Sequence, residues 1–162
     1  MNESPSRLGL ITAVCILLGC QQPPPGFTAD DDSHVRGMFD ATVANINAGN
    51  WVEWSRQFSD NAVLQPPNAE SVRSRAAILA WGQAFPPVEA LSYANVEVSG
   101  EGNWAYGTSD YVLKLQGAPA DSGKQLVVFR RGASGTWEIP AVSFSSNLPP
   151  VPPAPTPNPQ RE

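Results

Sequence analysis

The spacing of the apolar residues changes once along this chain, near residue 88, and that change restricts the folds open to it. Before this point apolar residues recur every three or four positions, as on the buried side of amphipathic helices. From Val88 to Ser145 they alternate with polar residues, as in strands that bury one face. Helices followed by a run of strands predict an α+β fold, with the helices on one face of a curved antiparallel sheet.

Three helices are expected in the first part of the chain. Asp30–Ser33 are good N-caps for the first helix, and Gly49 ends it. Its buried stripe consists of Val35, Met38, Phe39, Val43 and Ile46. Asn50 caps the second helix, with Glu53 in the position of a capping box. The inner face of that helix carries Trp51, Trp54 and Phe58. A third helix is predicted over residues 74–84.

Five strands are expected, separated by turn-forming residues. They cover residues 62–65, 88–99, 103–116, 124–131 and 136–145. Glycine-containing segments at 117–123 and 132–135 form the turns between the last three. Because Trp137 directly follows such a turn, we expect it to be half exposed, whereas Trp54 should be fully buried and more costly to truncate.

The N-terminal segment predicts export. Leu8–Gly19 is apolar and uncharged, and its twelve residues would span about 18 Å as a helix, short of the roughly 30 Å hydrocarbon core. Such a run suits a signal peptide. Its end, Leu17-Leu18-Gly19-Cys20, resembles the lipobox of bacterial lipoproteins, which implies lipidation of Cys20. The alternatives are a plain signal peptide or a buried helix with a chance cysteine. The lipobox implies anchoring to the bacterial cell envelope, with the domain facing the periplasm or the exterior.

Cysteine content and charge exclude several classes of function. Cys15 would leave with the signal peptide and Cys20 would be acylated, so the mature chain has no free thiol. A disulfide, a zinc–thiolate cluster and a cysteine nucleophile are then excluded, and we expect no metal and no cofactor. The net charge is −5, and nucleic acid is not expected as a partner because phosphate binding needs a basic face.

The chain divides into four parts. Residues 1–19 form the signal peptide, and residues 20–28 hold the lipidated cysteine and a Pro-rich spacer. Residues 29–148 form one domain. Residues 149–162 form a Pro-rich tail, in which seven prolines within 149–159 favour an extended polyproline conformation. This tail is interpreted as a disordered end, a spacer or a ligand for a proline-recognising groove.

Ten different short motifs follow one another over about a hundred residues. They are Gly49-Asn50-Trp51, Phe58 to Leu64, Pro66-Pro67-Asn68, Ala77-Ile78 with Trp81, Phe85-Pro86, Gly102 to Tyr106, Gly123-Lys124, Arg130-Arg131, Gly135-Thr136-Trp137 and Ser145 to Pro149. In these motifs the chain resembles the SnoaL-like, ketosteroid-isomerase-related branch of the nuclear transport factor two-like superfamily. The resemblance implies a cone-shaped curved sheet packed on three N-terminal helices, with a pocket between them. It also implies a homodimer, because family members are often dimers.

The resemblance bears directly on catalysis. Relatives that are isomerases, cyclases or dehydratases need a general base, and many carry an acidic residue in the last strand. Val142 occupies that position here, which removes the best candidate. Asp110 is the weak remaining candidate: it is a buried base, or it lies on the solvent face opposite Tyr111. His34 lies off the apolar stripe and is expected at the surface, and Asp60 is expected to be a turn or cap residue.

A binding pocket has more support than a catalytic centre. The predicted contacts are the aromatic residues Trp81, Phe85, Tyr106 and Tyr111 and the polar residues Gln65, Asn68, Arg131 and Asn147. The alternative is that the aromatic residues simply fill the core. We expect a neutral or anionic aromatic ligand held through Tyr111, Trp81 and Arg131, with the guanidinium meeting a carboxylate or phenolate at the pocket mouth.

Three functions follow from these observations. The first is a lipid-anchored binding or accessory domain that holds a small apolar or aromatic molecule without turning it over. The second is a cofactor-free isomerase, cyclase or hydrolase of the ketosteroid-isomerase kind. The third is a dimeric structural or interaction module.

Overall fold

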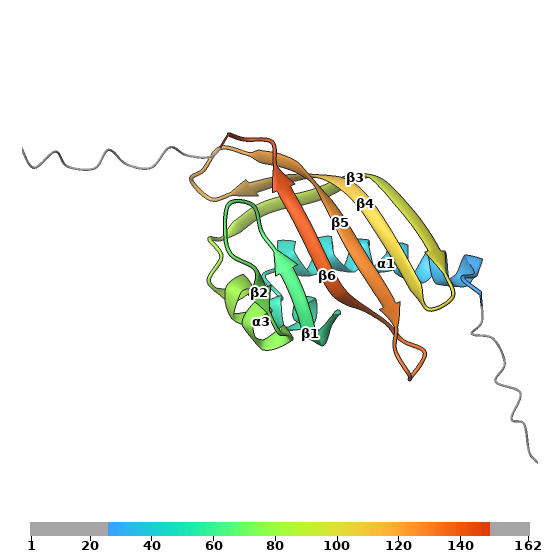
Figure 1. Cartoon of the computed structure of the whole chain (residues 1–162). Coiled ribbons are helices and arrows are strands. Elements are labelled where there is room, and N and C mark those ends of the chain that lie inside the picture. Colours follow the sequence, from blue (N-terminus) through green and yellow to red (C-terminus); the bar gives the residue numbers. More distant parts are fainter. Residues whose placement is uncertain (1–25, 150–162) are drawn as a thin grey trace, which may run out of the picture.

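The computed structural model of the protein describes residues 26–149, which form three helices and one six-stranded sheet (Figure 1). The helices are α1 (Ala29–Asn47), α2 (Trp51–Ser55) and α3 (Arg75–Gln83). The strands are β1 (Phe58–Gln65), β2 (Val72–Arg73), β3 (Val88–Glu101), β4 (Trp104–Leu115), β5 (Asp121–Arg131) and β6 (Trp137–Ser146). The predicted α+β class is confirmed. Within the described range, no helix is both long and apolar enough to span a bilayer.

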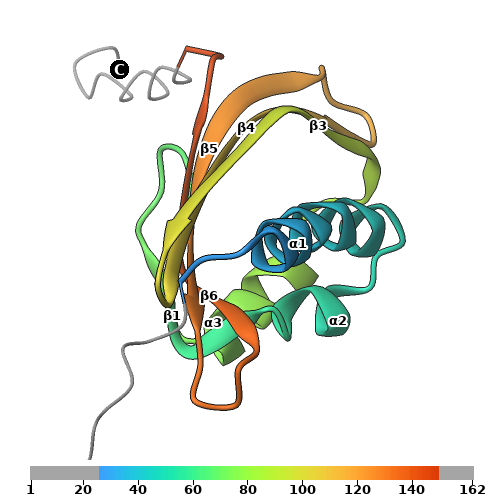
Figure 2. The same ribbon diagram turned by 90° about the vertical axis from the view of Figure 1, so that its right-hand side faces the viewer.

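The sheet has the strand order β2-β1-β6-β5-β4-β3. All neighbouring strands are antiparallel except β1 and β6, which run parallel. Figure 2 shows the long strands β3, β4 and β5 curling over α1, so that the helices lie on the concave side of the sheet. The curvature leaves an interior between sheet and helices, which is the space a binding site can use.

The residues that cap the N-termini of the three helices differ in part from those predicted. Thr28, rather than one of the aspartates, is the N-cap of α1, and it forms a capping box with Asp31. The predicted capping by Asp30–Ser33 was therefore wrong, although the aspartates do lie in the first turn, where negative charge suits the helix dipole. Asn50 makes no side-chain cap, so the predicted capping box of α2 was also wrong. The third helix begins where it was predicted, and Ser74 is its N-cap, whose hydroxyl accepts from the backbone nitrogen of Ala77.

The strands lie where the alternation placed them, with two corrections. The last four differ from the prediction by at most about three residues at each end. β1 begins at Phe58 rather than Ala62, so Phe58 lies on a strand and not on the second helix. The two-residue strand β2 was not predicted, since a run this short carries no detectable period.

The core lies between α1 and the concave face of β4, β5 and β6. From α1 it contains Val35, Met38 and Phe39, all buried. Gly107 on β4 allows this close approach, because a Cβ there would lie 2.6 Å from Cζ of Phe39. Most of the buried side chains come from the sheet and α2.

Trp137 is as buried as Trp54, with 4% and 5% of their surfaces exposed. The expectation that Trp137 would be half exposed was wrong, because its ring turns inward beneath the N-terminus of α1. Its indole nitrogen donates to Oδ1 of Asp31 over 3.0 Å, and Phe27 packs edge-on against the ring. The predicted signal peptide, Cys20 and the tail beyond Pro149 lie outside the described residues.

Candidate ligand-binding cavity

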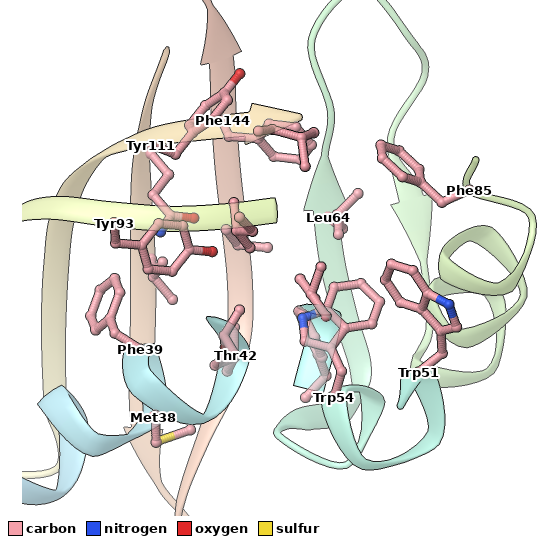
Figure 3. A pocket seen from close by; sticks show the side chains of 18 of the residues that line it. Met38, Phe39, Thr42, Trp51, Trp54, Leu64, Phe85, Tyr93, Tyr111 and Phe144 are labelled. Atoms are coloured by element: carbon pink, nitrogen blue, oxygen red, sulfur yellow. The ribbon is translucent and has the colours of Figure 1, made fainter. Parts of the chain in front are cut away.

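A partly open cavity of about 100 Å³ lies between the concave face of the sheet and the helices (Figure 3). Its lining is mostly apolar and comes from every helix and five of the six strands. The lining residues are Met38, Phe39, Thr42, Ile46, Trp51, Trp54, Phe58, Leu64, Trp81, Phe85, Val88, Leu91, Tyr93, Tyr111, Leu113, Gln125, Val127, Phe129, Ile139, Val142 and Phe144. Within the described part of the chain, this lining contains no carboxylate, imidazole, amine, guanidinium or thiol.

Aromatic rings form two connected walls of the cavity. On one side Trp54 packs edge-on against Trp51 and Phe58, with ring centroids 5.5 and 5.0 Å apart. On the other, Phe144 lies between Trp81 and Tyr111, at 6.3 and 6.1 Å. Edge-to-face packing fixes each ring against its neighbours. The walls are therefore in place before any ligand binds.

Three of the polar lining side chains have partners within the protein. Thr42 pairs with the side chain of Gln57. Tyr111 donates its hydroxyl proton to Oδ2 of Asp121 over 3.1 Å, and burial together with that carboxylate raises the pKa of Tyr111. Nε2 of Gln125 donates to the hydroxyl of Ser109 over 2.8 Å.

Tyr93 is the fourth polar lining residue. Burial raises the pKa of Tyr93 to about 12, and the neighbouring amide of Gln125 acts in the opposite direction as a hydrogen-bond donor. The phenol therefore stays protonated at neutral pH. In Figure 3 its hydroxyl oxygen points toward the open space between the labelled side chains, whereas that of Tyr111 points away from it.

Three of the eight predicted contact residues line the cavity and five do not. Trp81 and Tyr111 line it, as does Phe85. Tyr106 is 51% exposed, because the alternation of β4 places it on the face opposite Tyr111. Gln65 and Asn147 are exposed at strand ends and absent from the lining, as is the exposed Asn68. None of these four residues can therefore contact a molecule inside the cavity.

Arg131 also lies outside the cavity. Its Nη2 is 2.5 Å from Oδ2 of Asp31, and its guanidinium lies 4.9 Å from the ring centre of Trp137. The pair is held beneath the start of α1, with side chains only 16% and 12% exposed. The predicted contact between Arg131 and an anionic ligand at the pocket mouth has no support from this position.

The acidic and histidine candidates considered for catalysis are also absent from the cavity lining. Asp110 is exposed and accepts a hydrogen bond from Asn95 over 2.7 Å, which settles its position in favour of the solvent face. His34 is exposed, and the 92% exposed side chain of Asp60 pairs with Arg75. Val142, which the resemblance aligned with an acidic residue of relatives, does line the cavity. Among residues 26–149 no group of three or more His, Cys, Asp or Glu side chains could hold a metal ion.

Tyr93 and Gln125 are two of the polar lining residues that were not predicted from the sequence. Tyr93 shares the inner face of β3 with Leu91, so the alternation contained a signal for it. The register shifts between Ala94 and Glu97, where Asn95 has a φ of 52°, and this bulge interrupts the pattern just after Tyr93. Gln125 gave no local signal, because a polar residue on a strand is ordinarily read as solvent-facing.

A curved sheet wrapped over helices around an apolar cavity defines a class of small α+β domains. Within that class, the chain belongs to the SnoaL-like domain family, whose sequence model matches residues 35–138. No curated protein matches the chain.

Solved structures share the fold at low sequence identity. A nuclear transport factor two-like protein with a cystatin-like fold from Novosphingobium aromaticivorans is 16% identical, with a TM-score of 0.65, covering 73% of this chain and 82% of its own. A ketosteroid isomerase-like protein from Erwinia carotovora is 15% identical, with a TM-score of 0.64 and coverages of 75% and 100%. A Novosphingobium aromaticivorans protein provisionally named a scytalone dehydratase is 10% identical, with a TM-score of 0.63 and coverages of 74% and 85%.

Proposed function

We propose that this protein is a lipid-anchored binding domain that holds a small apolar or aromatic molecule in the cavity between its helices and sheet. The observation that carries the proposal is the lining: aromatic and aliphatic side chains surround the space, with a few polar groups among them. This mixture is typical of small-molecule sites. The names of two structural neighbours, ketosteroid isomerase-like and scytalone dehydratase, support a site for small molecules in this fold.

The composition of the lining favours binding over turnover. Isomerisation without a cofactor needs a group that accepts a proton near pH 7. Tyr93 and Tyr111 are the titratable side chains of the lining, and burial raises the pKa of both. Neither phenol is therefore a ready base. Turnover of a test ketosteroid by the full chain would support the enzymatic alternative instead.

Replacing Trp81 by alanine is expected to weaken ligand binding about tenfold. The change removes the ring that packs against Phe85 and Phe144 on one wall, and a lost aromatic contact costs about 0.5–1.5 kcal/mol beyond the lost apolar area. Isothermal titration calorimetry of the full chain with p-xylene measures the effect. Trp104→Ala is the matched control, because Trp104 is 52% exposed on the outer face. If Trp104→Ala weakens binding as much as Trp81→Ala does, the ligand binds elsewhere.

The anchoring part of the proposal rests on residues 17–20. Replacing Cys20 by serine is expected to abolish incorporation of a labelled fatty acid, because the thiol that would carry the diacylglycerol is gone. Cys15→Ser is the control, since that cysteine would leave with the signal peptide and its replacement should preserve labelling. Labelling and membrane fractionation of both variants in a bacterial host give the answer. Unchanged labelling of Cys20→Ser would refute lipidation at this residue.

A further inference from the structure

We infer that the molecule held in the cavity is uncharged, contains a single ring, and carries one hydroxyl group that Tyr93 and Gln125 recognise together. The inference rests on the proposed function and specifies the class of ligand. It comes from three properties of the lining: which hydrogen-bonding groups remain free, which charges are missing, and how much volume is available.

Among the hydroxyl and amide groups of the lining, one donor and one acceptor are available to a ligand. Tyr111 and Thr42 are committed to Asp121 and Gln57. The amide nitrogen of Gln125 donates to Ser109 over 2.8 Å. The side chain of Gln125 also lies beside the hydroxyl of Tyr93. Within residues 26–149 no other residue hydrogen-bonds to the Tyr93 hydroxyl or to Oε1 of Gln125, so the first can donate to a ligand and the second can accept from it.

A hydroxyl group on the ligand satisfies both of these atoms at once. Its oxygen accepts the proton of Tyr93, and its own proton is donated to Oε1 of Gln125. A ketone or ether would accept from Tyr93 but leave Oε1 of Gln125 unpaired. A hydrocarbon would leave both groups without partners in an apolar space, which is unfavourable.

The lining also excludes a charged ligand. Among the described residues neither a cationic nor a carboxylate side chain lines the cavity, and Arg131 is already paired with Asp31. The carboxylate of Asp121, which accepts a hydrogen bond from the lining residue Tyr111, would repel an anion. Burying an unpaired carboxylate is far costlier than burying a hydroxyl that finds its partners. Of the neutral and anionic ligands expected from the sequence, only the neutral one fits this lining.

The volume of the cavity limits the size of the ligand. About 100 Å³ of free space is of the order of engineered protein cavities that bind benzene. The ring stacks edge-on against the rings of the two aromatic walls. A phenol or a cyclic alcohol of one ring meets all three requirements, whereas a molecule of several fused rings exceeds the space.

Three probes of nearly equal shape test this inference on the full chain. p-Xylene, p-cresol and p-toluate share one methyl-substituted ring and carry a methyl, a hydroxyl and a carboxylate at the opposite position. In the wild-type protein we expect p-toluate to bind at least about a hundredfold more weakly than p-cresol. In Tyr93→Phe the affinity of p-cresol relative to p-xylene should fall about tenfold, because only p-cresol loses a hydrogen bond. Isothermal titration calorimetry measures all three probes.

Tyr106→Phe is the matched control, because it removes a hydroxyl from a half-exposed residue on the outer face of β4 and should leave the ratio unchanged. Gln125→Leu is a second variant. It removes the acceptor Oε1 and should lower the affinity of p-cresol relative to p-xylene by a similar factor. Equal ratios in the wild-type protein, Tyr93→Phe and Gln125→Leu, with p-xylene still bound, overturn the inference and leave the proposed function standing. Binding of p-toluate as tight as that of p-cresol also overturns it. If neither p-xylene nor p-cresol binds the wild-type protein, the proposed function itself fails and the inference fails with it.

Discussion

Replacing Asp31 by asparagine is expected to lower the free energy of unfolding by about 3–5 kcal/mol, which is the usual cost of leaving the other member of a buried ion pair without its partner. Asp31 is 9% exposed and lies in the first turn of α1. The substitution preserves its shape but removes its charge and replaces one of its two acceptor oxygens by an NH2 donor. The loss would therefore measure the electrostatic and hydrogen-bonding roles of the side chain rather than its packing.

Three elements meet at the Asp31 carboxylate. Oδ1 accepts from the indole nitrogen of Trp137 over 3.0 Å, at the start of β6. Oδ2 accepts from the backbone nitrogen and the hydroxyl of Thr28, over 2.9 and 2.7 Å, and so closes the N-terminus of α1. Arg131, at the end of β5, contributes the compensating charge. Within residues 26–149 its Nε and Nη2 make no hydrogen bond, so its guanidinium depends on the ion pair and on the face of Trp137.

Urea unfolding of the full chain measures this loss, and two further variants test its cause. Asp32→Asn removes a neighbouring carboxylate whose pair with Arg36 is well exposed, so it should cost less than about 1 kcal/mol. Arg131→Met in the Asp31→Asn background removes the unpaired charge and should restore much of the loss. If Asp31→Asn alone costs no more than Asp32→Asn, the ion pair has little effect on stability.

The same side chain predicts a dependence of stability on pH. Burial by itself would raise the pKa of Asp31, but the hydrogen bonds from Trp137 and Thr28 and the charge of Arg131 hold it well below its ordinary value. A depressed pKa in the folded state stabilises the protein fully above the unfolded-state pKa of about 3.9, and this contribution is lost as the pH falls below it. The stability difference between the wild-type protein and Asp31→Asn should therefore be largest near pH 7 and narrow below about pH 4.

The Asp31 cluster also shows where prediction from the sequence stops. The acidic run at the start of α1 indicated a helix N-terminus, which is local information. The choice of Thr28 as cap depends on Asp31, and Asp31 is held in place by Trp137, 106 positions away in the chain. No local pattern connects two such residues. Arg131 was wrongly placed at the pocket mouth for the same reason. Its partner, Asp31, is 100 positions away in the chain, and the sequence of the strand that carries Arg131 does not indicate it.

The cavity was partly predictable. The change of period predicted helices over one face of a curved sheet. On β4 the buried residues Ala105, Gly107, Ser109 and Tyr111 alternate with more exposed ones and mark its inner face. The same alternation places Tyr106 on the outer face, so Tyr106 and Tyr111 could not both line one pocket. Tyr93 and Gln125 needed the three-dimensional structure, because their pairing depends on two strands that are separated by β4 in the sheet.

Replacing Trp137 by alanine is expected to cost about 3–5 kcal/mol, at least as much as Trp54→Ala, which reverses the order that the glycine-rich turn before Trp137 had indicated. The two rings are equally buried, so the apolar term is nearly the same. Trp137 contributes more besides: it donates to Asp31 and supports the guanidinium of Arg131. Trp54 packs against Trp51 and Phe58 at the edge of the cavity, where its loss enlarges an existing space.

Phenylalanine substitutions separate the hydrogen bond from the ring. Trp137→Phe keeps an aromatic ring but leaves Oδ1 of Asp31 without its donor, and a buried acceptor left unsatisfied costs about 1–3 kcal/mol or more when it is charged. Trp54→Phe removes ring area alone, because within residues 26–149 its indole nitrogen makes no hydrogen bond, and should be tolerated better. Denaturant midpoints of the four variants at pH 7 decide the order. If Trp54→Phe proves as costly as Trp137→Phe, the bond to Asp31 contributes nothing measurable, and the aromatic wall of the cavity, rather than the cluster beneath α1, governs stability.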